Sequence, residues 1–199
     1  MDQEIEVKFY VANLFEINNR LCCIDAELKQ ERTLLVNDRF DTAEGTLQQT
    51  GKVLRIRSSS THQLTYKEKT SSPEKRVEIE LDINNPETAR RFLEALGYSR
   101  FSQYETYRET FCVGDVSIML DELPFGTFVE IEGPSIQEIE DMAQKLRLNW
   151  EKRVQKSYIE LFLHLRKEWP FTFNEATFEN FKGLPAVLPC DLDLEPADQ

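Results

Sequence analysis

The sequence is poor in the residues that usually build redox centres and zinc sites. Its 199 residues include four cysteines and two histidines. No two cysteines have the CxxC spacing of zinc and redox motifs, and Cys22 and Cys23 are adjacent, which disfavours a mutual disulfide. We therefore expect reduced thiols and a cytoplasmic protein, with Cys22 and Cys23 at least partly buried in a helix. His62 and His164 have no partner at ligand spacing and receive no functional role.

Positive charge and long apolar runs are also scarce. Lysine and arginine number 24 against 36 aspartates and glutamates, so the formal net charge is -12. This charge repels nucleic acid and anionic membranes at long range, and we expect neither as a partner. The sequence has no apolar run long enough to span a membrane, and its acidic start does not resemble a signal peptide. Nothing in it indicates an oligomeric state.

The length favours one main domain, which we predict over residues 1–167. Residues 168–199 are rich in proline, aromatic and acidic residues, and we expect a C-terminal tail without regular structure. The aromatic side chains of this tail are expected to pack back onto the domain because they would otherwise face water. They are Trp169, Phe171, Phe173, Phe178 and Phe181.

Charged and apolar residues alternate strictly at the start of the chain. In EIEVK, Glu4, Glu6 and Lys8 alternate with Ile5 and Val7, which places the charges on one face of a β-strand. Similar two-faced segments follow, separated by turn-prone stretches. They are RTLLVNDRFDT (32–42), KVLRIR (52–57), HQLTYKEK (62–69), KRVEIELDI (75–83), QYETYRETFCV (103–113), VSIMLDEL (116–123) and TFVEIEG (127–133).

Amphipathic helices are predicted within 11–28, 84–98, 135–146 and 154–169. Their expected apolar faces include Leu14, Phe15, Ile17, Leu21 and Ile24 in the first helix and Phe92, Leu93 and Leu96 in the second.

The charged strand faces carry mostly arginine, lysine and glutamate rather than the mixed polar residues of a solvated sheet. We interpret this as an α+β fold built on an eight-stranded antiparallel β-barrel, a tunnel with a charged lumen and helices packed outside. For any single strand, an ordinary sheet with one solvated face remains the alternative. The predicted lumen contains the bases Lys8, Arg55, Arg57, Lys67, Lys69, Arg76, Arg108 and Lys156 and the acids Glu4, Glu6, Glu78, Glu80, Asp121, Glu130 and Glu132.

Two Glu-x-Glu pairs, 4 with 6 and 130 with 132, would converge on cations if their strands face each other. Carboxylate ligands without histidine or cysteine suit Mg²⁺ or Mn²⁺. Two such ions would leave the lumen with an excess of roughly five positive charges, about what a triphosphate neutralises. The basic rows would then clamp the phosphoryl groups while a metal-activated water attacks in line.

The ordered set of motifs resembles the CYTH family, also called triphosphate tunnel metalloenzymes. EIEVK at 4–8 matches the family's Glu-x-Glu-x-Lys motif, which alone is a weak signal. The resemblance continues in the family's order through FDT (40–42), LRIR (54–57), TYK (65–67), RVEIE (76–80), YRETF (107–111), LDELPFGTFVEIEG (120–133) and KSYIEL (156–161).

The resemblance implies a tunnel that binds triphosphates with divalent metal and cleaves the phosphoanhydride. It implies metal ligands at Glu4, Glu6, Glu130 and Glu132, with Glu78 and Glu80 near the metals, and a clamp of Lys8, Arg55, Arg57, Lys67, Arg108 and Lys156. We add Lys69 and Arg76 as substrate-binding residues and assign catalytic roles to Lys8, Arg108 and Asp121. Many members carry a lysine at the position of Thr106, and Lys69 is the candidate replacement.

Three functions are compatible with this reading. The first is a metal-dependent hydrolase of inorganic triphosphate or of an organic triphosphate such as thiamine triphosphate or a nucleotide. The second is a class IV adenylyl cyclase, which makes cyclic AMP and pyrophosphate from ATP. The third is a non-catalytic module that binds polyphosphate or nucleotides.

Overall fold

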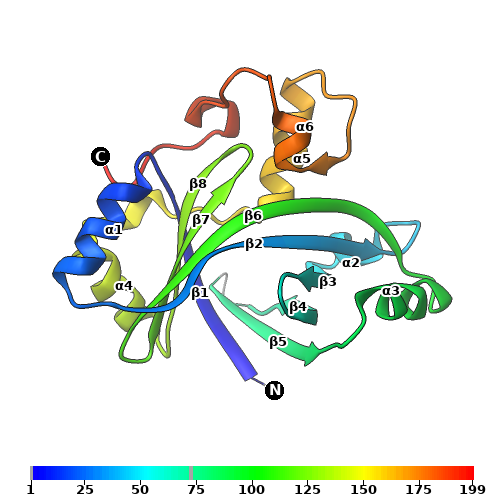
Figure 1. Ribbon diagram of the computed structural model, residues 1–199, viewed down its shortest axis with the longest axis horizontal. Coiled ribbons are helices and arrows are strands. Elements are labelled where there is room, and N and C mark those ends of the chain that lie inside the picture. Colours follow the sequence, from blue (N-terminus) through cyan, green and yellow to red (C-terminus); the bar gives the residue numbers. More distant parts are fainter. Residues whose placement is uncertain (1, 72–73) are drawn as a thin grey trace.

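A closed ring of eight strands dominates the computed structural model, which describes residues 2–71 and 74–199 (Figure 1). The ring consists of β1 (Asp2–Val11), β2 (Glu27–Asp41), β3 (Lys52–Ser58), β4 (His62–Lys69), β5 (Lys75–Asp82), β6 (Ser99–Val113), β7 (Val116–Leu123) and β8 (Gly126–Glu132). The predicted α+β fold around an antiparallel eight-stranded tunnel is confirmed.

Each strand of the ring pairs with two neighbours, and every one of these pairings is antiparallel. The order is β1, β8, β7, β6, β2, β3, β4 and β5, and β5 returns to β1. The long strands β2 and β6 lie side by side, from Glu27 opposite Cys112 to Asp41 opposite Ser99 (Figure 1). Because alternate residues point to opposite faces, closure gives the ring one interior and one exterior set of side chains.

The helices are α1 (Leu14–Cys23), α2 (Thr46–Gln49), α3 (Pro86–Ala95), α4 (Ile136–Lys145), α5 (Tyr158–Glu168) and α6 (Phe178–Phe181), with 3₁₀ turns at Trp150–Lys152 and Pro189–Leu192. Helices α1 and α4 pack on the exterior of β1, β7 and β8. Buried Phe9 of β1 and Ile131 of β8 share one cluster with Ile17 of α1 and Ile139 of α4. The apolar side chains of β1, β7 and β8 therefore point outward and are covered by helices, whereas Ile79 and Leu81 of β5 are 48% and 56% exposed.

The other helices close further parts of the exterior. Leu93 of α3 packs with Phe40, Leu54 and Ile56 in a separate small cluster. The Asp41 carboxylate accepts backbone N–H bonds from Leu47 and Gln48 at 2.8 and 3.0 Å and so caps α2. Asp41 therefore has the strand-end role that FDT-like segments usually require of an aspartate.

Two of the expected apolar faces are less buried than the sequence suggests. Phe15 on α1 is 71% exposed, and Phe92 and Leu96 on α3 are 62% and 59% exposed. Cys22 and Cys23 are exposed on α1, which corrects the expectation that they are partly buried. Ile17 and Leu21 are the buried residues of α1, and Leu93 is that of α3, so the other apolar side chains of these two helices remain partly or largely in water. None of the described helices has both the length and the apolar character needed to cross a bilayer.

The C-terminal tail has regular structure, contrary to expectation. It contains α6, the 3₁₀ turn at 189–192 and the short strand β9 (Glu175–Ala176), which pairs in parallel with β6 at Gln103 and Tyr104. Strand β7 pairs with β6 only over Tyr107–Val113, so β9 occupies a stretch of backbone that β7 leaves free. The backbone hydrogen bonds of β6 explain why this tail is ordered.

The aromatic residues of the tail pack on α5 as predicted. The buried ring of Phe162 on α5 lies 6.4, 6.3 and 6.2 Å from the rings of Phe171, Phe173 and Phe181, and 6.3 Å from that of Phe125. These rings belong to one hydrophobic cluster with the tunnel's exterior.

The last residues of the tail close on the end of β1. The Ala197 N–H donates to the carbonyl of Tyr10 at 2.8 Å, and Ala197 is 1% exposed. The Asp198 carboxylate accepts the N–H groups of Ala12 and Asn13 at 2.8 and 3.0 Å.

We predict that Phe162→Ala lowers the free energy of unfolding by about 3–5 kcal/mol, because it removes a fully buried ring from this cluster. Phe15→Ala, which truncates an exposed ring on α1, is the matched control and should change stability by less than about 0.5 kcal/mol. Urea denaturation followed by circular dichroism measures both. Equal effects of the two variants would contradict the packing described for the tail.

Candidate functional site

A cavity of about 410 Å³ runs through the interior of the ring. Every strand of the ring contributes side chains to its wall, and Ser157 and Tyr158 at the start of α5 complete it. Most of the predicted site residues line it: Glu4, Glu6, Lys8, Arg55, Arg57, Lys67, Arg76, Glu78, Glu80, Arg108, Glu130 and Glu132. The alternation seen in the sequence therefore brings these distant charges into one enclosed space.

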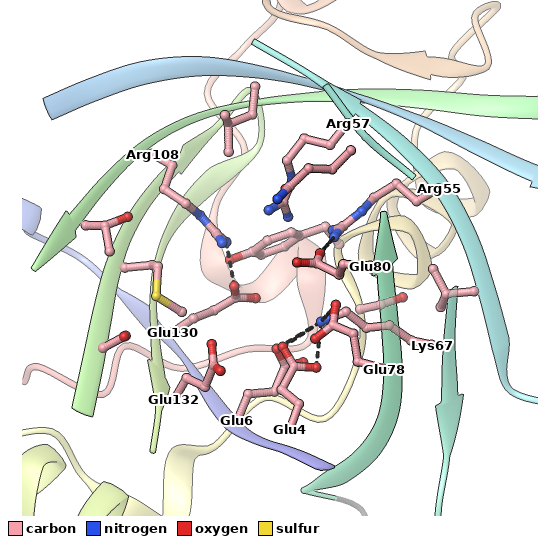
Figure 2. A pocket seen from close by; sticks show the side chains of 18 of the residues that line it. Glu4, Glu6, Arg55, Arg57, Lys67, Glu78, Glu80, Arg108, Glu130 and Glu132 are labelled. Carbon is pink, nitrogen blue, oxygen red and sulfur yellow. Dashed lines mark hydrogen bonds and ion pairs between the residues drawn. The ribbon is translucent and has the colours of Figure 1, made fainter. Parts of the chain in front are cut away.

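The charges are separated by sign within the cavity. Figure 2 shows Arg55, Arg57 and Arg108 on one side and Glu4, Glu6, Glu78 and Glu132 on the other. We call the four glutamates the carboxylate end. We call Arg55 and Arg57, together with Arg39, the guanidinium end.

One lysine serves three glutamates at the carboxylate end. The Lys67 Nζ lies 2.6 Å from both oxygens of Glu4, 3.1 Å from Glu78 and 3.9 Å from Glu6. Glu6 also pairs with Arg76. A single ammonium cannot neutralise three carboxylates, so negative charge remains in excess here.

Two glutamates at the carboxylate end have raised pKa values. Burial raises the pKa of Glu78 to about 7; Lys67 opposes the shift and the Glu4 carboxylate adds to it. Burial, and then the neighbouring Glu4, also raise the pKa of Glu132. Glu132 lies directly opposite Glu6 across the β1–β8 ladder, and no lysine or arginine among residues 2–71 and 74–199 forms an ion pair with it.

A tightly connected ionic cluster lies between the two ends. Glu130 accepts contacts from Lys8 at 3.1 Å and from Arg108 at 2.5 Å. Burial by itself would raise the pKa of Glu130, but Lys8 and Arg108 outweigh it and hold this pKa well below its ordinary value. Asp121 receives a bidentate fork from Arg108 at 2.7 and 2.5 Å and a 2.7 Å hydrogen bond from the Tyr158 hydroxyl. Arg108 is thus fixed in orientation.

Positive charge is in excess at the guanidinium end. Arg57 donates through Nε to the Asn37 amide oxygen at 3.1 Å, and Arg55 lies 3.9 Å from Glu80. Burial, followed by the charges of Arg55 and Arg108, lowers the pKa of Arg57 to about 10. Burial would raise the pKa of the Tyr104 phenol, but the surrounding guanidinium groups lower it.

Three predicted site residues do not line the cavity. Asp121 is fully buried behind Arg108 and is a positioning residue rather than a wall residue. Lys69 is exposed. The Lys156 side chain is 43% exposed and lies 3.8 Å from Asp193 of the tail. The position of Thr106 is buried, and its hydroxyl has no hydrogen-bond partner among the described residues.

Sequence reasoning missed Arg39, Tyr104 and Tyr158 as wall residues. A signal for Arg39 was present, because Asn37 and Arg39 alternate with Asp38 and Phe40 in a predicted strand. Asp38 points away from the cavity and pairs with Arg90 and Arg100 on the exterior. The same alternation gave a signal for Tyr104, which lies four residues before Arg108 in a predicted strand, but Tyr158 lies at the start of a helix and gave none.

The donor chemistry of the carboxylate end fits a hard divalent cation. Its ligand atoms are all carboxylate oxygens, and Glu4, Glu6 and Glu132 carry more negative charge than their basic partners balance. In the part of the chain that the structure describes, no three acidic, histidine or cysteine side chains are already gathered in metal-binding geometry. Glu4, Glu6 and Glu78 contact lysine or arginine instead.

Comparison with known proteins identifies the same architecture. The CYTH domain profile matches residues 2–160. No curated protein matches the chain. A candidate adenylate cyclase from Vibrio parahaemolyticus is similar in structure, with 25% identity and a TM-score of 0.74, over 80% of this chain and 97% of that one.

Two further solved structures share the fold. The PH1819 protein of Pyrococcus horikoshii OT3 has 27% identity and a TM-score of 0.68, over 80% of this chain and 98% of that one. The candidate adenylyl cyclase HpAC1 from Hippeastrum, described as having a dominant triphosphatase activity, has 18% identity and a TM-score of 0.55, over 71% and 84%. The CYTH family includes triphosphatases and class IV adenylyl cyclases and is generally metal-dependent. On the profile match over residues 2–160, this chain belongs to the CYTH family.

Proposed function

We propose that this protein is a metal-dependent hydrolase that cleaves a phosphoanhydride bond of a triphosphate. The observation that carries the proposal is the separation of charge in the enclosed cavity, where surplus carboxylates face surplus guanidinium groups. A chain of phosphoryl groups with bound divalent cations is the small ligand that complements both surpluses at once. The volume of about 410 Å³ accommodates such a chain.

Glu4, Glu6 and Glu132 would hold the cation, which is Mg²⁺ or Mn²⁺. Glu78, Glu80 and Glu130 stay predicted as further ligands of the cation. When bound, the cation would neutralise charge on the phosphate oxygens and lower the pKa of the attacking water. Release of Glu4 from Lys67 would accompany cation binding, because the two share both carboxylate oxygens.

The chain's own residues perform the rest of the chemistry. Arg108 is held rigidly by Asp121 and is ready to bind oxygens of the transferred phosphoryl group, where charge develops in the transition state. Lys8 lies 3.1 Å from Glu130 and would contribute a point charge beside it. Glu78, whose pKa burial raises to about 7 in the metal-free protein, stays a predicted cation ligand, and a bound cation would hold its carboxylate ionised.

A class IV adenylyl cyclase is the second candidate, because solved relatives are described as candidate adenylate cyclases. It would need the same cation and clamp, but it would direct a ribose hydroxyl rather than a water at the phosphorus.

The four cysteines are unpaired, which supports the proposal of a reducing, cytoplasmic compartment.

Phosphorus NMR separates the candidates. The protein is incubated in turn with tripolyphosphate, thiamine triphosphate and ATP, with Mg²⁺ or Mn²⁺ and with an EDTA control. Metal-dependent release of orthophosphate supports the hydrolase, and the fastest substrate identifies the organic moiety. Pyrophosphate and cyclic AMP from ATP would establish the cyclase, and no turnover of any substrate would favour a binding module.

Glu132→Gln should lower metal-dependent kcat/KM by at least about 100-fold, since it removes a preorganised ligand charge. The protein should stay folded, because no described basic residue loses an ion-pair partner. The control is Glu94→Gln on α3, which makes the same chemical change at an exposed site. Initial rates at saturating metal test the prediction, and wild-type rates in Glu132→Gln would refute the assignment of Glu132.

Glu78 should make the metal-free protein less stable as pH rises. Its folded pKa of about 7 lies above the ordinary value of 4.5, so the folded state binds the proton more tightly than the unfolded chain between these values. Stability is therefore lost as pH increases from about 4.5 to about 7. In EDTA, the difference in unfolding free energy between Glu78→Gln and wild type should grow in favour of the variant over this window. A difference that stays constant with pH would contradict the raised pKa.

A further inference from the structure

Arg39 is a buried cation in the wall of the cavity that forms no ion pair with any described residue. Its side chain belongs to β2, lines the cavity and is 7% exposed. Its Nε is buried and has no hydrogen-bond partner. Within residues 2–71 and 74–199, no carboxylate lies within ion-pair distance of its guanidinium group. Burial, together with the charge of Arg55, lowers the pKa of Arg39.

The neighbours of Arg39 on the adjacent strand are also positively charged. Arg55 stands directly opposite Arg39 in the β2–β3 ladder, and like charges in this position repel. Two residues further along the same ladder, Arg57 lies opposite Asn37 and contacts its amide rather than a carboxylate. The Nε of Arg55 is also buried without a partner. Among the described residues, Glu80, at 3.9 Å from Arg55, is the one carboxylate within ion-pair distance of these three arginines.

Such an arrangement is costly unless a ligand completes it. Burying an unpaired charge is strongly unfavourable, and a protein that only needed stability would place a neutral side chain here. Guanidinium groups match the oxygens of a phosphoryl group in a bidentate manner, and a terminal phosphoryl group carries the largest charge of a polyphosphate chain. Asn37 already fixes the orientation of Arg57. The unused donors of Arg39 and Arg55 thus describe a preformed anion site.

We propose that Arg39, with Arg55 and Arg57, forms a subsite for the terminal phosphoryl group of the substrate at the end of the cavity opposite the carboxylates. The inference rests on the proposed function and deepens it, because it sets which end of a triphosphate points away from the cation. It also makes Arg39 a determinant of the length of polyphosphate that binds, since a shorter polyphosphate held by the cation at the carboxylate end does not reach the subsite.

The test is the affinity of the full-length protein for the non-hydrolysable imido analogues of tripolyphosphate and of pyrophosphate, measured by isothermal titration calorimetry with Mg²⁺, so that the cation can hold the chain at the carboxylate end and no turnover occurs. Arg39→Gln should weaken tripolyphosphate binding by about 10- to 100-fold, the effect of losing a charge-assisted contact, and pyrophosphate binding much less. Arg91→Gln on the exposed face of α3 is the control for net charge and should bind within about twofold of wild type.

Thermal melting without anion gives a second readout. Arg39→Gln should melt at or above the wild-type temperature, because it removes an uncompensated buried charge. A lower melting temperature with unchanged tripolyphosphate affinity would show a structural role and overturn the proposal. Arg39→Lys keeps the charge without the fork and should bind with an affinity between those of wild type and Arg39→Gln.

The outcomes separate this inference from the proposed function. Wild-type protein that binds the tripolyphosphate analogue with Mg²⁺ but never hydrolyses tripolyphosphate with metal would refute the hydrolase alone. Arg39→Gln that binds tripolyphosphate as tightly as Arg91→Gln would refute the subsite alone. An equal loss of affinity for tripolyphosphate and pyrophosphate would also overturn the assignment to the terminal phosphoryl group.

Discussion

Ion pairing across neighbouring strands inside the ring is the constraint on which the rest of the structure depends. The strand register places Lys8 opposite Glu130 and Lys67 opposite Glu78, so opposite charges meet inside the cavity. A slip of one residue would send these charges into the exterior clusters and bring apolar side chains inside. The exterior position of Phe9 and Ile131, and the helices that cover them, follow from keeping the charges inward.

Ion pairing is incomplete at both ends of the cavity. Negative charge is in excess at the carboxylate end, and positive charge is in excess at the guanidinium end. Among the described residues, Glu132 has no basic ion-pair partner at one end, and Arg39 has no acidic one at the other. In the middle, Glu130 and Asp121 share Arg108, and Glu130 also pairs with Lys8. The ion pairs in the middle stabilise the ring, whereas the charges at the two ends are left for the ligand and its cations to neutralise.

Much of this arrangement could be predicted from residue alternation, because period-two patterns such as EIEVK fix which side chains share a face. The same rule could not show that Lys156 pairs with Asp193, since that contact joins distant segments outside the strands. It also could not place Asp121 behind Arg108 rather than in the cavity wall, which depends on the hydroxyl of Tyr158 from α5. The order of the tail was missed for a related reason, because β9 pairs with a part of β6 that is free only in the folded ring.

Ring closure also governs how the chain folds. Strand β1 pairs with β8, and β2 pairs with β6, so the two halves of the ring meet only after most of the sequence is available. Contacts of such long sequence separation make folding slow, because a large loop must close before they form. Until then the edges of β1 and β2 present unpaired backbone groups that can join strands of other molecules. During synthesis the N-terminal strand therefore waits for residues 126–132, and its alternating charges protect it from aggregation over that interval.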